Sequence, residues 1–508
     1  MYINMFISPK FGDDYSPGTL FGKQIIVTNA KKFSSRECED FFSKFNFLDL
    51  ARAICGLAKH LLTEKNSVFC GRYFTDRTLC IALTLAVKYA SKQPSRKPIS
   101  TEDLKSVIEI AWGEDDKKLL SLKYSSEILS QIMHVQQVER LLYLLARYWC
   151  VFSCLWPRDT CDIDPLRIIK KKYGVSYKII LFFALAACKD GHLFAYDNAQ
   201  DFSSSFGEEI DCDAHKRFLE HFSCGMEEWV KESIPPQYIR TPILRTDLVP
   251  DGMTKTVYFI PSSNNLLARV TVGMYHEIAD MYNHGDGDNK FRVLFGNIFE
   301  NYIYTLLGFY VKNRSVARAI KYGSKKNPKE TVDFLLKKDR TLILIEVKQA
   351  SIYAEAQYTG NLDLLKVNLH RTVGKAVEQL RITENLLKNG EKSLCAYHDC
   401  NQIKKLIVLN SPLYNANNIC KILLDDMGKS AADVSIINIS EFETLLDLQS
   451  ETQDLWEMLE KKESGEYKDF DFNEFFHYAY PDRSNNTVFL KNYFNQIYDG
   501  SAFKNPAK

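Results

Sequence analysis

The feature that most constrains the fold is the stretch from Thr331 to Ala350, TVDFLLKKDRTLILIEVKQA. Two short apolar runs flank the polar segment KKDR, a pattern that predicts a β-hairpin with strands over 331–336 and 341–347. The second run is apolar enough to be buried, yet it carries the carboxylate Glu346 and is followed by Lys348. A buried strand with two charges at one end indicates a site.

The two charges of the second strand lie on one face of the sheet. Side chains in a strand alternate between faces, so Glu346 and Lys348 point the same way. A loop of either two or four residues within KKDR places Leu336 opposite Thr341. Asp333 then lies diagonal to Glu346 on the same face, with about 7–8 Å between the backbones.

Two carboxylates placed this close together are costly to bury without a cation. The side chains of Asp333 and Glu346 and the carbonyl of Val347 therefore predict an oxygen-rich site for Mg²⁺ or Mn²⁺. Lys348 would activate the attacking water or neutralise a scissile phosphate.

The tripeptide E-x-K carries little information by itself. It recurs at 460–462 and 466–468, in polar sequence with no strand and no acidic residue on a partner strand. A structural hairpin whose charged end is solvated therefore stays an alternative for 331–348.

The arrangement V-D-F-L-L…L-I-L-I-E-V-K resembles the signature of the PD-(D/E)XK nuclease superfamily, with Val332 in the position of the family's proline. The preceding helix, with the motif G-N-I-F-E-N-Y, would add the acid Glu300, which would hold a second metal ion or orient a metal-bound water. The following helix, with K-A-V-E-Q-L, would add Gln379 facing the site. The resemblance covers about 290–446. It implies a restriction-endonuclease-like α/β fold, a mixed sheet flanked by helices, and metal-dependent hydrolysis of phosphodiesters.

Glu300 also has a place in the helix predicted over 291–307. It is only 100° from Phe299, at the edge of the apolar stripe, and Gly296 on its own face would allow a close approach to the hairpin. An exposed glutamate at the stripe's margin is the alternative. The predicted stripe consists of Phe291, Leu294, Phe295, Ile298, Phe299, Tyr302 and Leu306.

Basic residues are concentrated before the hairpin, where 311–329 contains no acid. These side chains would hold a nucleic-acid backbone through its phosphates, in a salt-sensitive way. A solvated basic face is the alternative. The residues assigned to nucleic-acid binding are Lys321, Lys325, Lys326, Arg371 and Lys375.

A pattern of possible zinc ligands precedes this region, as C-x2-H and H-x2-C. Read as one helix, the stretch turns by about 180° between His215 and Cys224, so the four side chains cannot converge on one ion. We expect no zinc site there.

The chain is expected to contain three parts. Residues 1–245 have apolar residues at helical spacing and predict a mainly α-helical domain that selects targets, controls activity or binds a partner. Residues 246–449 would form the nuclease domain, and 450–508 a helical, aromatic extension.

The composition favours a soluble, cytoplasmic protein. The 13 cysteines are an odd number and lie in apolar stretches, which suits reduced thiols better than a disulfide framework. The longest apolar run, 179–188, is too short to span a bilayer. With a formal net charge of +1, any surface that binds nucleic acid has to be local.

These observations predict a Mg²⁺- or Mn²⁺-dependent nuclease acting by in-line attack of water on a phosphodiester. DNA is favoured over RNA because the superfamily it resembles mostly cuts DNA. Prokaryotic restriction or antiviral defence is the expected context, with a protein partner or second copy bound through the N-terminal domain. The alternative is a catalytically silent nuclease fold that binds nucleic acid or assembles a complex.

Overall fold

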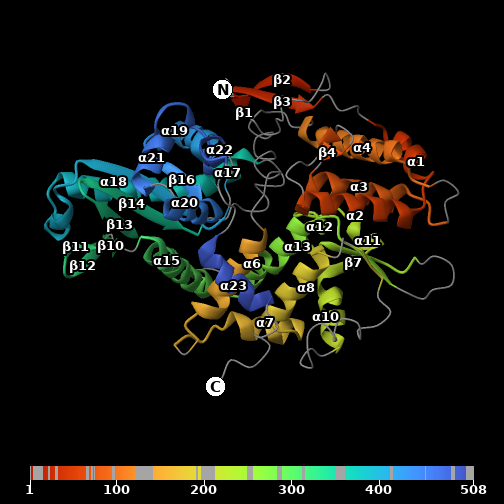
Figure 1. Cartoon of the computed structure of the whole chain (residues 1–508), viewed down its shortest axis with the longest axis horizontal. Helices are drawn as coiled ribbons and strands as arrows, with labels where there is room; N and C mark the ends of the chain where they lie inside the picture. The colour runs from red at the N-terminus through yellow and green to blue at the C-terminus, as the bar shows by residue number, and fades with distance from the viewer. Residues whose placement is uncertain are drawn as a thin grey trace. The chain divides into compact units, whose positions relative to one another are not determined.

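The chain folds into two compact units (Figure 1). Unit 1 comprises Met1–Tyr148, Asp162–Asp280 and Asn495–Lys508, and unit 2 comprises Trp149–Cys161 and Met281–Phe494. The predicted boundary at 245/246 lies inside unit 1. The computed structural model describes residues 2–3, 15–20, 23–28, 33–63, 68–69, 72–73, 75–93, 98–120, 141–158, 160–189, 193–195, 212–248, 256–282, 289–311, 315–349, 361–411, 413, 416–451, 454–481 and 487–498.

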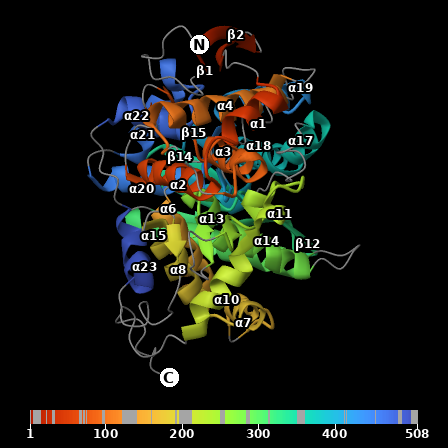
Figure 2. The ribbon, with the colours of Figure 1, turned by 90° about the vertical axis from the view of Figure 1, so that its right-hand side faces the viewer.

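Unit 1 is largely helical, as the spacing of its apolar residues predicts. Helix α3 packs against both α2 and α4 (Figures 1 and 2). Its helices are α1 (Ser35–Phe42), α2 (Phe47–Thr63), α3 (Asp76–Tyr89), α4 (Thr101–Leu120), α6 (Leu141–Trp149), α7 (Pro165–Tyr173), α8 (Tyr177–Lys189), α10 (Cys212–Phe222), α11 (Met226–Trp229), α12 (Gln237–Arg240), α13 (Ser263–Val270) and α14 (Val272–Met281).

Unit 1 also contains strands that the helical spacing does not predict. Four form a sheet in the order β6-β9-β8-β7. The strands are β1 (Tyr2–Ile3), β2 (Tyr15–Leu20), β3 (Lys23–Thr28), β4 (Val68–Phe69), β5 (Arg72–Tyr73), β6 (Leu193–Ala195), β7 (Ser223–Gly225), β8 (Ile243–Thr246) and β9 (Val257–Phe259). Cys224 therefore lies in β7, and the prediction of one helix through the cysteine–histidine pattern was wrong.

Unit 2 is built on a mixed five-stranded sheet in the order β10-β13-β14-β15-β16. β13 is antiparallel to both neighbours, whereas β14, β15 and β16 are parallel. The central strand β14 is covered on both faces, which explains its nearly continuous apolar sequence. The strands are β10 (Ser315–Arg318), β13 (Phe334–Lys338), β14 (Thr341–Lys348), β15 (Gln402–Leu409) and β16 (Ser435–Asn438).

Helices cover both faces of this sheet. Phe334 stacks on Tyr304 of α15, with ring centroids 6.2 Å apart, so α15 covers the face of Phe334. Lys405 lies opposite Leu344 and reaches Glu384 of α18, so α18 covers the other face. The helices are α15 (Lys290–Tyr310), α17 (Leu362–Leu369), α18 (Lys375–Lys388), α19 (Lys421–Asp426), α20 (Ile439–Glu451), α21 (Leu455–Glu463), α22 (Phe472–Ala479) and α23 (Val488–Tyr498).

Unit 2 also contains five short helical segments in its described residues, among them η3 (Lys392–Tyr397), η4 (Ala416–Cys420) and η5 (Gly465–Tyr467). The π turn η1 (Cys150–Cys154) brings Phe152 against Phe295 of α15, and Trp156 stacks on Phe291 at 5.5 Å between centroids. A second π turn, η2 (His370–Gly374), joins α17 to α18 without a break. The predicted mixed α/β architecture behind a largely helical N-terminal region is thus confirmed.

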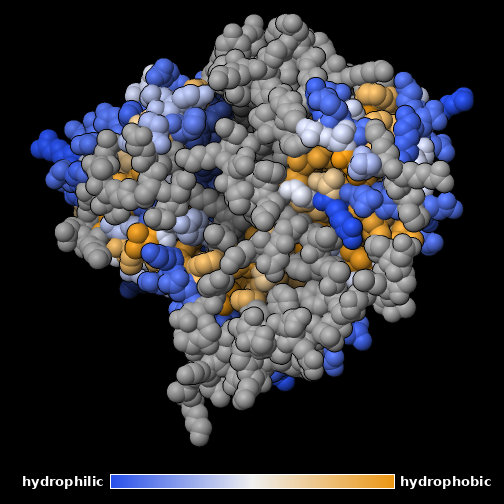
Figure 3. Space-filling view, turned by 45° about the vertical axis from the view of Figure 1, so that its right-hand side comes forward, coloured by the Kyte–Doolittle hydropathy of each residue, from blue (hydrophilic) through white to orange (hydrophobic). Residues whose placement is uncertain are grey.

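Among the residues that are coloured in Figure 3, most of those at the outer margins are polar, and hydrophobic residues gather in smaller areas between them. None of the helices in the described ranges is long and apolar enough to cross a membrane. Among the cysteines whose side chains are described, no disulfide bond is formed.

Candidate active site

The register of the hairpin differs from the predicted one by two residues. Lys338 pairs with Thr341, so the loop consists of Asp339 and Arg340, and the pairing of Leu336 with Thr341 was wrong. Asp339 has a φ of 52°, the left-handed conformation that a tight two-residue hairpin loop requires.

A shift of two residues keeps every side chain on its predicted face, because the period of a strand is two. It brings Asp333, the residue just before the first paired residue Phe334, to the end of β14, since Phe334 pairs with Ile345. Oδ2 of Asp333 accepts a hydrogen bond of 2.7 Å from the backbone N–H of Val347. Val347 adjoins Glu346 in the chain, so this bond holds Asp333 at the end of β14.

Glu346 is the most deeply buried of the three acids Glu300, Asp333 and Glu346. It is only 3% exposed, and its Oε1 accepts a hydrogen bond of 2.5 Å from Nζ of Lys348. Its Oε2 is buried and makes no hydrogen bond of standard geometry with the described residues, although the N–H of Asp333 lies near enough to the carboxyl to lower its pKa. Burial, followed by the charge of Asp333, raises the pKa of Glu346 to about 8.

The pKa values of Asp333 and Lys348 are shifted as well. Burial raises the pKa of Asp333, although the N–H of Val347 and the ammonium of Lys348 oppose it. Burial alone would lower the pKa of Lys348, but the charge and hydrogen bond of Glu346 outweigh it and leave this pKa raised. Lys348 therefore stays protonated, as a phosphate-binding group requires.

Glu300 lies at the edge of the buried stripe of α15, as predicted, and is itself half-buried. Burial first, and then the charge of Asp333, raise the pKa of Glu300 to about 7, while Lys348 and Arg318 lower it. Glu300 is thus within electrostatic reach of the hairpin acids. The observed stripe differs in that Leu294 is only half-buried and Ile303 is buried.

The role predicted for Gly296 was wrong. A Cβ at this position would meet only Oε1 of Gln349, at 3.9 Å, which is an ordinary contact. Close approach of α15 to the hairpin therefore does not depend on the absence of a side chain here.

The oxygen atoms present suit a hard divalent cation. The carboxylates of Asp333 and Glu346 and the Val347 carbonyl are ligands that Mg²⁺ and Mn²⁺ accept, and Oε2 of Glu346 is a buried oxygen that a cation could bind. Within the described part of the chain, no three His, Cys, Asp or Glu side chains gather into a metal-binding group. Glu300 thus is not drawn into a three-acid cluster.

Gln379 contacts the backbone that leads into the site. Its Nε2 donates to the carbonyls of Glu330 and Thr331, at 2.7 and 3.1 Å. One turn later on α18, Oγ1 of Thr383 accepts a hydrogen bond of 3.1 Å from the N–H of Val332. These two side chains, which we call the α18 clamp, fix the residues directly before Asp333. Gln379 is therefore a positioning residue by its contacts.

The clamp gives a test of stability. Thr383→Val is expected to cost about 1–3 kcal/mol, because it leaves the buried N–H of Val332 without an acceptor. Thr305→Val is the matched control, since the Thr305 hydroxyl only donates back to the Asn301 carbonyl of its own helix. Urea unfolding measures both. Equal stability of the two variants would contradict the clamp.

No protein-family model, curated protein or solved structure matches the chain. The chemistry of the site is accordingly inferred from its own residues.

The basic residues assigned to nucleic-acid binding lie in two places. Lys321, Lys325 and Lys326 belong to an exposed hairpin formed by β11 (Lys321–Ser324) and β12 (Asn327–Glu330). Arg371 lies in η2 and Lys375 begins α18, one turn before Gln379, and both are exposed. Two further basic residues of the predicted run, Lys312 and Arg314, lie outside the described residues.

Proposed function

We propose that this protein is a Mg²⁺- or Mn²⁺-dependent nuclease of the PD-(D/E)XK type that cuts DNA. The observation that carries the proposal is Asp333 held at the end of β14 by the N–H of Val347, close enough for its charge to raise the pKa of the buried Glu346, to which Lys348 is bonded. A purely structural hairpin would gain nothing from two carboxylates raised above their usual pKa by burial.

The order of elements in unit 2 supports the proposal. Helix α15, the hairpin β13–β14, helix α18, strands β15 and β16 and helix α20 follow one another as the resemblance implies. The two halves of the hairpin are antiparallel, and the strands that follow are parallel to β14. This arrangement puts both acids and the lysine at the same end of the central strands.

Each residue has a separate task in this proposal. Asp333, Glu346 and the Val347 carbonyl would hold the cation, which when bound supplies Lewis-acid polarisation of the phosphate and a lower pKa for the attacking water. Lys348 carries a positive charge to a phosphate oxygen. Glu300, with a pKa of about 7, is suited to accepting the proton that the attacking water loses.

The largely helical N-terminal part would select targets, control activity or bind a partner chain. Its described residues contribute none of the acids of the candidate site, and unit 2 already holds Glu300, Asp333 and Glu346. Restriction or antiviral defence in a prokaryote is the context we propose.

A cleavage panel tests the function. Purified full-length protein is incubated with plasmid, linear duplex DNA, single strands and RNA, in Mg²⁺, Mn²⁺ or chelator. We expect DNA to be cut with either metal and to stay intact with chelator. Cleavage of no substrate with either metal would favour the second candidate, a catalytically silent module that binds nucleic acid or assembles a complex.

A further inference from the structure

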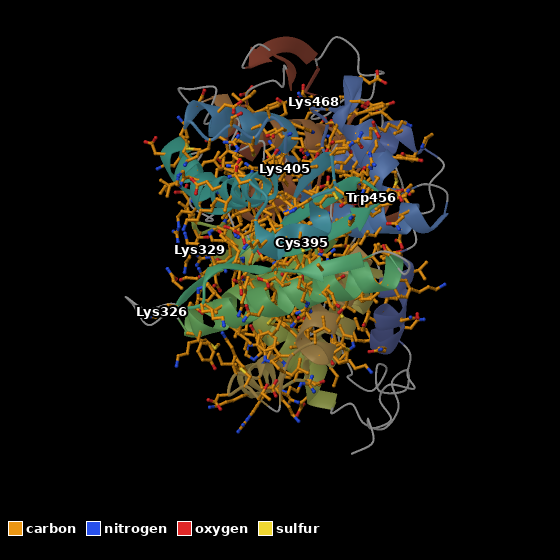
Figure 4. The ribbon with its side chains drawn as sticks, turned by 90° about the vertical axis from the view of Figure 1, so that its left-hand side faces the viewer. Lys326, Lys329, Cys395, Lys405, Trp456 and Lys468 are labelled. Atoms are coloured by element: carbon orange, nitrogen blue, oxygen red, sulfur yellow. The ribbon has the colours of Figure 1, made fainter. Side chains whose placement is uncertain are left out.

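The hairpin β11–β12 is a two-stranded ribbon separate from the main sheet of unit 2. It is inserted between β10 and β13, and nearly all of its side chains are exposed. Ser324 pairs with Asn327, so Lys325 and Lys326 form the tip. Figure 1 draws the ribbon beside β10, and Figure 4 places Lys326 and Lys329 at one margin of the view, away from Lys405.

The register gives the ribbon two different faces. On the first, Lys321 lies opposite Glu330, with Nζ and Oε1 3.9 Å apart, so the charges compensate. The second has Tyr322 opposite Lys329 and the polar pair of Ser324 and Asn327. This second face and the tip contain no acid. The second face and the tip together therefore form a positively charged surface that can make hydrogen bonds and that carries one aromatic ring.

The base of the ribbon is fixed close to the candidate site. The N–H of Ile320 donates to Oγ1 of Thr331 at 2.9 Å, and the N–H of Thr331 donates to the carbonyl of Ile320 at 3.1 Å. Gln379 of the α18 clamp also donates to the carbonyl of Thr331, which lies two residues before Asp333. A ligand on the ribbon is thus held at a set distance from the acids.

We propose that this ribbon enters the major groove of duplex DNA and sets the position of the strand that is cut. This proposal rests on the proposed nuclease function. The major groove of B-form DNA, about 12 Å wide, admits a two-stranded β-ribbon, whereas the major groove of duplex RNA is too narrow for side chains to read. The tip lysines bind phosphates, and Ser324 and Asn327 contact base edges.

Binding is measured by fluorescence anisotropy with the full-length protein in chelator, so that no strand is cut. The probes are a duplex DNA, one of its single strands and a duplex RNA of the same sequence. The test variant combines Lys325→Gln, Lys326→Gln and Lys329→Gln. The control combines Lys392→Gln, Lys468→Gln and Lys491→Gln, which removes the same charge from exposed positions elsewhere in unit 2 (Figure 4 shows Lys468 far from Lys326).

We expect the wild type to bind duplex DNA more tightly than the other two probes. In the test variant, the slope of log K against log salt should become shallower by up to about 0.9 for each phosphate that the ribbon no longer neutralises. The control should keep the wild-type slope, and replacement of the three ribbon lysines by arginine should restore it. Unchanged thermal midpoints show that the exposed substitutions leave the fold intact.

Two results would overturn the ribbon proposal. One is a test variant that binds duplex DNA like the control. The other is a wild type that binds single strands or duplex RNA as tightly as duplex DNA, which would mean a general basic surface instead of a groove ribbon. Failure of the nuclease proposal is separate, because it appears as ribbon-dependent binding of duplex DNA without any cleavage in Mg²⁺ or Mn²⁺.

Discussion

Glu346→Gln is expected to lower the rate of DNA cleavage by more than the roughly 10–100-fold that loss of an outer-shell partner typically costs. The amide keeps the size of the side chain but removes the charge that holds Lys348 and that the cation needs. Its NH₂ group also places a donor where the buried Oε2 now lies. Single-turnover cleavage across a Mn²⁺ titration measures the loss.

A control of equal burial separates chemistry from stability. Glu443→Gln changes a glutamate that is 1% exposed in unit 2, and its Oε1 accepts a hydrogen bond of 2.6 Å from the Tyr302 hydroxyl, which an amide oxygen can still accept. We expect this variant to cut at the wild-type rate. If Glu346→Gln also cuts at that rate at every metal concentration, Glu346 is not part of an active site.

The second large effect concerns pH. Without divalent metal, the free energy of unfolding should fall as pH rises from about 5 to about 8. The pKa values of Glu346 and Glu300 are raised to about 8 and about 7 in the folded state, so in this window the folded state binds more protons than the unfolded state. At 1.36 kcal/mol per pKa unit, the contribution of Glu346 alone is a few kcal/mol.

A bound cation should reverse this dependence. Mg²⁺ or Mn²⁺ takes the ionised carboxylates and releases their protons, so the metal should stabilise the protein more at pH 8 than at pH 6. Glu441 also has a pKa raised to about 8 by burial, so the informative quantity is the difference between wild type and Glu346→Gln. Urea unfolding of both proteins at both pH values, with and without metal, measures this difference in the free energy of unfolding. A difference that does not change with pH would contradict the burial of an ionisable Glu346.

Much of the hairpin follows from local chemistry. The face shared by Asp333, Glu346 and Lys348 is correct because strand side chains alternate, and even a register error of two residues preserves it. The register itself depends on which loop residue takes a positive φ. Within KKDR that is Asp339, and aspartate is the one of these residue types that favours this conformation, so the loop chemistry was a signal for the observed register.

The contacts between residues far apart in the chain could not be predicted from the sequence. The resemblance implies that Gln379 faces the site, but it does not say that the amide donates to two backbone carbonyls instead of a ligand. Thr383 was missed altogether, because its partner, the N–H of Val332, lies 51 residues away. The one available signal was its position four residues after Gln379, on the same side of α18.

The division of the chain also limits how unit 2 can be isolated. The chain passes between the units four times, at 148/149, 161/162, 280/281 and 494/495. A fragment that begins at 246 would lack Phe152 and Trp156, and would leave Phe291 and Phe295 of α15 exposed where those rings now pack. No single cut therefore excises unit 2, and a smaller protein that keeps its packing would need a permutation of the chain segments instead of a truncation.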